Sequence, residues 1–259
     1  MINETMQFTE HIDALDGMKK YPSVLYYRGN PLLLNRLKIS IVGSRRPSAY
    51  TQQITYELSK KLSKAGVCIV SGAAMGVDAI AHNAAGPDNT IAVMANGLDI
   101  RYPAMNRSLI TSIEHEGLAI SQFEDAQKAA PWSFVVRNEV VVALGDVLIV
   151  TQADEKSGSM RSVEYALKMG KKVYVLPQRI SESEGTNALL RDGKAEAIYN
   201  IDTFIAPYGQ TAKHLNDPFL LFCQNSPTYE EAVKQFPQEV FQYELEGKID
   251  VVAGSIVVV

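Results

Sequence analysis

The stretch KISIVGSRRP, residues 38–47, joins a short apolar run to a glycine turn, two arginines and a proline. A helical pattern follows it from Ser48 to Ala65. This order is typical of a buried parallel strand that leads into the N-terminus of a helix. Backbone N–H groups in the first turn of such a helix attract anions, and an arginine can add a bidentate contact to a phosphate. The stretch therefore favours an anion site, while a tight turn with two solvated arginines explains it about equally well.

The region from residue 38 to residue 206 repeats this alternation of strand and helix. Strand candidates, each followed by a polar or glycine-bearing turn and a helical segment, lie at 38–43, 67–71, 90–95, 118–121, 146–151 and 172–176. Repeated units of this kind predict an α/β fold, a doubly wound and mostly parallel sheet with helices on both faces. Ligands bind such sheets outside the carboxyl ends of the strands, where the strand order reverses.

Small and polar residues follow several of these strands. They include Gly43 to Arg46 after the first strand, the glycine-rich segment 71–78 after the second, and the segment 152–161 after the fifth. Ser157 and Thr186 are suitable N-cap residues, so further helix starts are expected at the same edge. Several anion-receptive helix starts at one edge would suit a ligand with several phosphates.

The composition is that of an ordinary globular protein. The 259 residues carry a net charge of −4 and are 46% hydrophobic, which argues against indiscriminate nucleic-acid binding by bulk charge but allows a local basic pocket. Cys68 and Cys223 lie in apolar runs and are expected to be buried thiols, with no disulfide framework or metal site. No segment resembles a signal peptide or a membrane span, and a cytoplasmic location is expected.

Four regions are predicted along the chain. Residues 1–37 form an N-terminal extension that packs on the main domain, residues 38–206 form that domain, and residues 207–216 are a polar linker. Residues 217–259 show three short helical patterns at 218–224, 228–235 and 239–247, then two strands at 248–252 and 256–259 turned by 253–255, as in a small winged helix. This last region has seven acids and two lysines, a net charge of −5, so it is expected to repel phosphate and to bind protein or serve a structural role.

Six blocks, in this order and spacing, carry a family resemblance. They are IVGSRRPSAY (41–50), SGAAMGVDAIAH (71–82), TIAVMANGLDIRYPAMNRSL (90–109), FVVRNEVVVAL (134–144), SGSMRS (157–162) and GTNALLRDG (185–193). Together they resemble the DNA-processing protein A (DprA/Smf) family over roughly residues 20–206. The resemblance implies an extended Rossmann-like domain that binds single-stranded DNA in a basic pocket and forms homodimers. It also implies that the protein loads the RecA recombinase onto incoming DNA in natural transformation.

The family motifs and the local chemistry of the loops together assign residues. Those expected to bind DNA are Gly43, Ser44, Arg45, Arg46, Gly72, Ala73, Phe134, Arg137, Asn138, Ser157, Gly158 and Ser159. Arg45, Arg46 and Arg137 are expected to line one groove, and no catalytic residue, cofactor or metal is predicted. The chain departs from the family pattern at Glu139, Arg161 and Gln178, where Glu139 subtracts a positive charge near the pocket and Arg161 restores one.

Other interpretations of single residues stay open. Arg137 could be a structural arginine that pairs with Glu139 or Asp146, and Phe134 could be a core residue, with Trp132 as the next candidate to stack on a base. Asp78 is expected to bond the backbone of the second loop rather than to catalyse.

The histidines indicate no chemistry. His82 reads as a buried histidine with a partner, and His11, His115 and His214 have no carboxylate or cysteine at metal-ligand spacing.

A second class of function is an enzyme that processes nucleotides or phosphoribosyl groups on the same scaffold. Such an enzyme needs a titratable pair near neutral pH. Asp78, Asp99 and Asp154 offer no evident partner in the sequence.

Overall fold

The computed structural model describes residues 4–215, 217–223, 227–252 and 254–258. Contacts divide the chain into two compact units, Met1–Gly209 and Gln210–Val259. The division lies within the segment 207–216 that the sequence indicates as a polar linker. That segment is helical up to Leu215, because helix α7 runs over Ile201–Leu215. Of the ranges discussed above, residues 1–3, 216, 224–226, 253 and 259 lie outside the described residues.

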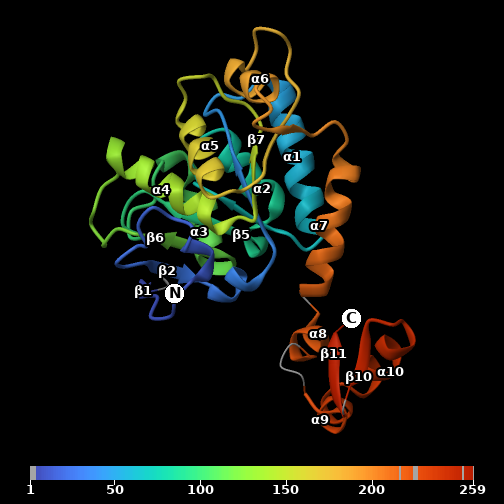
Figure 1. Ribbon diagram of the computed structural model, residues 1–259. Coiled ribbons are helices and arrows are strands. Elements are labelled where there is room, and N and C mark those ends of the chain that lie inside the picture. Colours follow the sequence, from blue (N-terminus) through green and yellow to red (C-terminus); the bar gives the residue numbers. More distant parts are fainter. Residues whose placement is uncertain (1–3, 216, 224–226, 253, 259) are drawn as a thin grey trace. The chain divides into compact units, whose positions relative to one another are not determined.

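The first unit is built on one nine-stranded sheet (Figure 1). Its strand order is β1 (Met6–Gln7), β2 (Tyr26–Gly29), β6 (Leu118–Ser121), β5 (Thr90–Met94), β4 (Cys68–Ser71), β3 (Lys38–Val42), β7 (Val147–Val150), β8 (Val173–Val175) and β9 (Glu196–Ala197). The seven strands that follow one another in space from β6 through β5, β4, β3, β7 and β8 to β9 run parallel. Strand β2 pairs antiparallel with β6, and β1 pairs antiparallel with β2. The predicted α/β class and all six predicted strands are confirmed. Strands β1, β2 and β9 are additions to those six.

The strand order reverses beside β3. From β3 the chain adds β4, β5 and β6 on one side, and then crosses to β7, β8 and β9 on the other. Val42 aligns with Val150 across the β3–β7 pair, so these two strands end side by side. A crevice at this point is the expected ligand position in a doubly wound sheet.

Helices cover both faces of the sheet. One face carries α4 (Pro131–Leu144) and α5 (Gly158–Lys168), and the other carries α1 (Ala49–Lys64), α2 (Val77–Ala85) and α3 (Arg107–Glu116). The sequence settles the start of α1 locally, because the Ser48 side chain accepts the backbone N–H of Thr51. Pro131 occupies the first position of α4, where a missing N–H costs nothing.

The N-terminal segment, from Met6 onward, forms one edge of this sheet. Strands β1 and β2 extend it beyond β6, and Leu15, Met18 and Leu25 are buried in the main core. The Lys19 backbone N–H donates to the Glu139 carboxylate over 2.8 Å. Glu139 is therefore occupied in holding the N-terminal segment.

The second unit comprises three helices followed by a two-stranded antiparallel hairpin, as the sequence indicates. The helices are α8 (Pro218–Cys223), α9 (Tyr229–Gln235) and α10 (Pro237–Leu245), and the strands are β10 (Ile249–Val252) and β11 (Ser255–Val258). A small core joins them, with Phe219, Val240 and Ile256 fully buried or nearly so. No helix within the described residues is long and apolar enough to cross a membrane.

Candidate functional site

An open cleft lies at the carboxyl edge of the sheet, where β3 and β7 end. Its lining comes from four segments of the chain: the end of β3 with the loop after it, the loop after β4 with the start of α2, the first turns of α4, and the segment that leads from β7 into the start of α5. The residues are Val42, Gly43, Ser44, Arg45, Ala74, Asp78, Pro131, Phe134, Val135, Arg137, Asn138, Ala153, Asp154, Ser157, Gly158, Ser159, Arg161 and Ser162. The cleft thus occupies the switch point of the sheet.

Most of the residues predicted from the sequence meet in this cleft. Gly43, Ser44, Arg45, Phe134, Arg137, Asn138, Ser157, Gly158 and Ser159 all line it. Gly72 lines a small adjoining cavity together with Arg45, Phe134 and Arg137. Ala73 is fully buried, and the exposed Arg46 is not part of the cleft lining, so the structure does not bring these two side chains to the site.

Arg45 and Phe134 form the mouth of the cleft. The Arg45 guanidinium lies 5.3 Å from the centre of the Phe134 ring, in cation–π geometry, and is exposed. Phe134 is half-buried and lines both the cleft and the adjoining cavity, so it is not a core residue. Trp132 packs edge-on against Phe123 and does not line the cleft. An exposed cation and a half-buried aromatic ring thus lie together at the cleft.

Arg137 has a different environment, because its side chain is only 4% exposed. Its Nη1 donates to the carbonyl oxygens of Gly72 and Val93, and its Nε donates to Asn138 Oδ1 over 3.1 Å. Burial lowers the pKa of this guanidinium, and the nearby Asp78 carboxylate opposes the effect. These contacts favour the structural interpretation of Arg137.

The partners expected for a structural Arg137 are nevertheless wrong. The Glu139 carboxylate accepts the Lys19 N–H, and the Asp146 carboxylate accepts the Lys38 N–H over 2.9 Å. Glu139 is not part of the cleft lining, although it directly follows the lining residue Asn138.

Gly72 is required by this arrangement. A Cβ atom at position 72 would lie 2.1 Å from Arg137 Nη1, far inside van der Waals contact. Only glycine therefore lets the second loop close over the guanidinium. The neighbouring Ala73 adopts a left-handed conformation with φ of 53°, and the Asn106 side chain donates to its carbonyl oxygen over 3.0 Å.

Asp78 holds the same loop from the other side. Its Oδ2 accepts the Ala74 N–H over 3.4 Å, which confirms the predicted backbone-bonding role. Burial raises the pKa of this carboxyl, and the Arg137 guanidinium opposes the shift. Asp78 and Asp154 are the carboxylates among the described lining residues, and that lining contains no histidine.

The start of α5 forms the opposite wall. Ser157 occupies the N-cap position, and the Ser159 hydroxyl donates to the Gly43 carbonyl over 3.0 Å, which ties the helix start to the end of β3. A side chain at Gly158 would meet nothing within 4 Å, so the backbone there is open to a ligand. First-turn N–H groups have no acceptor within their own helix, which makes this wall receptive to anions.

The N-cap expected at Thr186 is wrong. Helix α6 begins at Glu184 (Glu184–Arg191), after Ser183 with a left-handed φ of 54°. Thr186 lies in the first turn, where its hydroxyl is 2.7 Å from the Ser183 hydroxyl.

The other departures from the family pattern have distinct roles. Arg161 is exposed and lines the cleft, where it adds positive charge. Gln178 donates to the Thr151 carbonyl over 2.8 Å and so ties the loop after β8 to the end of β7. The sequence did not single out Asp154 as a site residue, although its position directly after β7 was the available signal.

Two histidines, His82 and His11, have polar side chains close to their rings. His82 is fully buried with its Nδ1 2.5 Å from the Thr90 hydroxyl, which confirms the expected partnered histidine, and burial lowers its pKa to about 3. His11 does have carboxylate neighbours, contrary to expectation: its Nε2 lies 2.8 Å from Asp16 Oδ1 and 3.8 Å from Asp13 Oδ1. All three residues are exposed and lie outside the cleft.

Comparisons with known proteins agree on one family. The model of the family described as DNA recombination-mediator protein A matches residues 4–209. DNA processing protein DprA of Bacillus subtilis is 32% identical over 203 residues, which cover 76% of this chain and 68% of that protein. Protein Smf of Synechocystis is 35% identical over 198 residues, 73% of this chain but 49% of that protein, so the chain spans about half of its length.

Solved structures give the same answer. DNA processing protein A of Helicobacter pylori, whose structure was described for its single-stranded DNA binding mode, superposes with a TM-score of 0.79 at 42% identity over 81% of this chain and 98% of that one. DprA of Streptococcus pneumoniae gives a TM-score of 0.73 at 30% identity over 79% of this chain and 74% of that one.

Proposed function

The chain belongs to the DNA recombination-mediator protein A family, and we propose from this premise that it binds single-stranded DNA in the cleft between the ends of β3 and β7. The structure of the Helicobacter relative, described for its single-stranded DNA binding mode, covers 81% of this chain. The proposal extends that property to the residues found here.

The pairing of Arg45 with Phe134 carries the proposal. Single-stranded nucleic acid is held by cations that neutralise phosphates and by aromatic faces on which bases stack. Arg45 and Phe134 supply one of each, with the exposed guanidinium 5.3 Å from the centre of the half-buried ring. Because every base has a π-face, such a site binds without strong sequence preference.

The walls of the cleft suit a passing phosphate chain. We assign DNA contacts to Gly43, Ser44, Arg45, Phe134 and Asn138, and to the α5 start at Ser157, Gly158 and Ser159. The first-turn N–H groups of α5 and the exposed Arg161 face phosphates. Arg137 and Gly72 act on DNA binding indirectly, because they hold the loop that shapes the cleft.

Charge distribution supports a division of labour between the two units. Residues 217–259 carry a net charge of −5. Because the whole chain carries −4, the remainder carries about +1. An acidic unit repels phosphate, so we assign DNA binding to the first unit and a protein-contact or structural role to the second.

At the cellular level, we propose that the protein protects incoming single-stranded DNA and loads the RecA recombinase in natural transformation, acting as a homodimer in the cytoplasm. Family membership supports this role. We propose that the protein binds DNA without catalysis. The Asp78 carboxylate bonds the backbone of the second loop, and the described lining residues include no histidine that could pair with it.

One observation favours the alternative, a nucleotide-processing enzyme. Asp78 is a buried carboxyl with a raised pKa at the cleft, a property that general acids share. Incubation with nucleoside monophosphates separates the two classes. Released base that disappears in Asp78→Asn would establish the enzyme, whereas the binding protein leaves the nucleotides intact.

A titration tests the main proposal directly. Labelled single-stranded DNA and duplex of the same length are titrated with the protein at several salt concentrations. We expect tighter binding of the single strand, because the cleft offers phosphate and stacking contacts but no helix that carries a set of base-reading side chains. Equal affinity for the duplex would contradict the proposal.

A further inference from the structure

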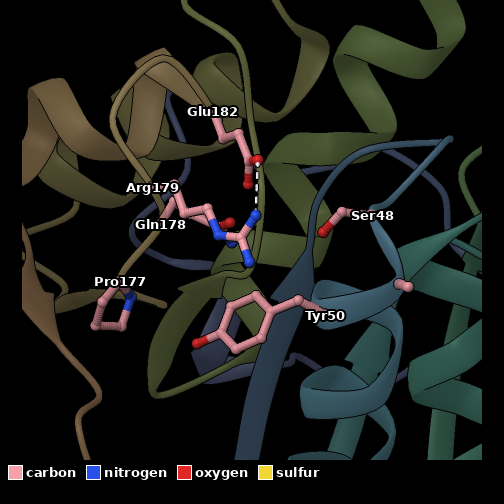
Figure 2. Close-up of a pocket in the computed structure, with 7 residues that line it drawn as sticks. Ser48, Tyr50, Pro177, Gln178, Arg179 and Glu182 are labelled. Atoms are coloured by element: carbon pink, nitrogen blue, oxygen red, sulfur yellow. Dashed lines mark ion pairs between the residues drawn. The ribbon is translucent and has the colours of Figure 1, made fainter.

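A second hollow opens on the same edge of the sheet, between the start of α1 and the loop after β8 (Figure 2). Its lining consists of Ser48, Ala49, Tyr50, Pro177, Gln178, Arg179 and Glu182. None of these residues belongs to the cleft lining or to the residues assigned to DNA above.

The hollow and the cleft are joined by two continuous segments. Residues 43–45 line the cleft, and three residues further along Ser48 lines the hollow, a reach of at most about 11 Å. The segment after β7 also runs from the cleft to the hollow. Its Ala153 and Asp154 line the cleft, while Gln152 accepts the Ser48 N–H over 2.9 Å and Thr151 accepts from Gln178. The two depressions therefore share one hydrogen-bonded floor.

An aromatic ring and a cation face this hollow, as they face the cleft. Tyr50 is 47% exposed although it belongs to a helix that packs on the sheet, and the Arg179 side chain is 88% exposed. Figure 2 shows both side chains directed into the same space. The ion pair of Arg179 with Glu182 is long, at 3.9 Å, and such a surface pair contributes little, so Arg179 can exchange it for a phosphate.

Arg46 lies on the chain between the two depressions. Its N–H donates to the Ser44 hydroxyl over 3.1 Å, which braces the turn, and its side chain is exposed. No ion-pair partner for this side chain occurs among the residues that the structure describes. A free cation at this point suits a phosphate on its way from one depression to the other.

We propose that the hollow is a second subsite for single-stranded DNA, in which Tyr50 stacks on a base and Arg179 neutralises a phosphate after the strand has passed Arg46. This inference rests on the proposed function of the cleft. The hollow is partly open to solvent, which suits a chain that runs through it. Stacking and phosphate contact at separate points extend the strand contact beyond the switch point of the sheet.

Two matched pairs of variants test the subsite. Tyr50→Ala is compared with Tyr56→Ala, because Tyr56 is also 47% exposed and lies on the same helix, outside the hollow. Arg179→Ala is compared with Lys172→Ala, because Lys172 is an exposed cation in a similarly long pair, 3.8 Å from Glu196, and precedes β8 at the opposite edge of the sheet. Tyr50→Phe keeps the ring and should behave as the parent.

The assay is anisotropy with labelled oligothymidylates from about 4 to about 20 nucleotides, a range of typical single-strand site sizes. With the long strands, Tyr50→Ala should weaken binding by about fivefold or more. Arg179→Ala should flatten the slope of log affinity against log salt by about 0.7. With the shortest strands, which fill the cleft alone, both variants should bind as the parent does, and the two control variants should do so at every length.

Parallel measurement of Arg45→Ala separates this inference from the proposed function. If Arg45→Ala weakens binding while Tyr50→Ala and Arg179→Ala match the parent at every length, the subsite is wrong and the cleft stands. If the parent does not bind single strands, both proposals are wrong. An equal loss in Tyr50→Ala and Tyr56→Ala would also overturn the subsite, because it would show a general effect of altering α1.

Discussion

Replacement of Arg45 by alanine is the sharpest test of the cleft. The Arg45 side chain is exposed and its one ring contact lies at 5.3 Å, so its loss should cost the fold only about 0.5–1 kcal/mol. For a unit of this size the melting temperature should then fall by about 1–4 °C. The fold therefore survives, and any large change in DNA binding reports on the contact itself.

The effect on binding should be much larger. A charge-assisted contact to a phosphate contributes about 1.5–3 kcal/mol, so Arg45→Ala should weaken single-strand binding about tenfold or more at low salt. Loss of one phosphate contact also flattens the salt slope by about 0.7. For each tenfold rise in salt, the parent should therefore lose about fivefold more affinity than the variant does.

The assay is a salt-series titration with labelled single strands, with thermal melting as the check on folding. Arg45→Lys is the matched control, because it keeps the charge and should keep the slope while losing the planar contact with Phe134. Phe134→Leu should lower affinity and leave the slope unchanged, since it removes stacking but no charge. An Arg45→Ala variant that is folded and keeps the slope of the parent would refute the assignment.

Three further outcomes follow from the structure. Arg137→Ala should lower the free energy of unfolding by about 2–6 kcal/mol in chemical denaturation, because the buried carbonyl groups of Gly72 and Val93 lose their donor at about 1–3 kcal/mol each, and its folded fraction should keep the salt slope of the parent; a changed slope would show that Arg137 contacts phosphate. A chain that ends at Leu215 keeps α7 whole and should bind single strands within a few-fold of the parent, provided that it melts cooperatively and keeps the parent's oligomeric state; a large loss of affinity would place DNA on the second unit. A thiol reagent should find no reactive cysteine in the native protein and two after denaturation, because Cys68 and Cys223 are buried and burial raises the pKa of their thiols to about 12 and about 11; rapid labelling of the native protein would contradict this burial.

The segment 207–216 shows how tertiary packing can override a local signal. Proline and glycine interrupt helices, yet α7 continues through Pro207 and Gly209. The aromatic rings on either side of Pro207 explain this: Phe204 packs on Tyr174 at 4.9 Å between centroids, and Tyr208 packs on Phe204 at 5.1 Å. Tertiary packing thus offsets the hydrogen bond that the proline removes.

The different environments of the two predicted arginines could not be inferred from the sequence either. Arg45 and Arg137 were given the same role, but one is exposed at the mouth of the cleft and the other is enclosed by carbonyl groups. The acceptors of Arg137 are Gly72 and Val93, which lie 65 and 44 residues away in the sequence. No local pattern around position 137 indicates them.

The amino-acid sequence by itself determined the alternation of strands and helices, and with it the edge at which the site lies. Apolar runs closed by small polar residues are local features, and parallel connection brings the carboxyl ends of such strands together whatever the details of packing. The direction of each side chain was decided only by the tertiary structure. Glu139 binds the Lys19 N–H instead of facing the cleft, and Tyr50 and Arg179 meet across a hollow although 129 positions separate them in the sequence. The partners of these side chains come from distant strands and loops. A charged side chain is buried only where such partners offset the cost of removing it from water.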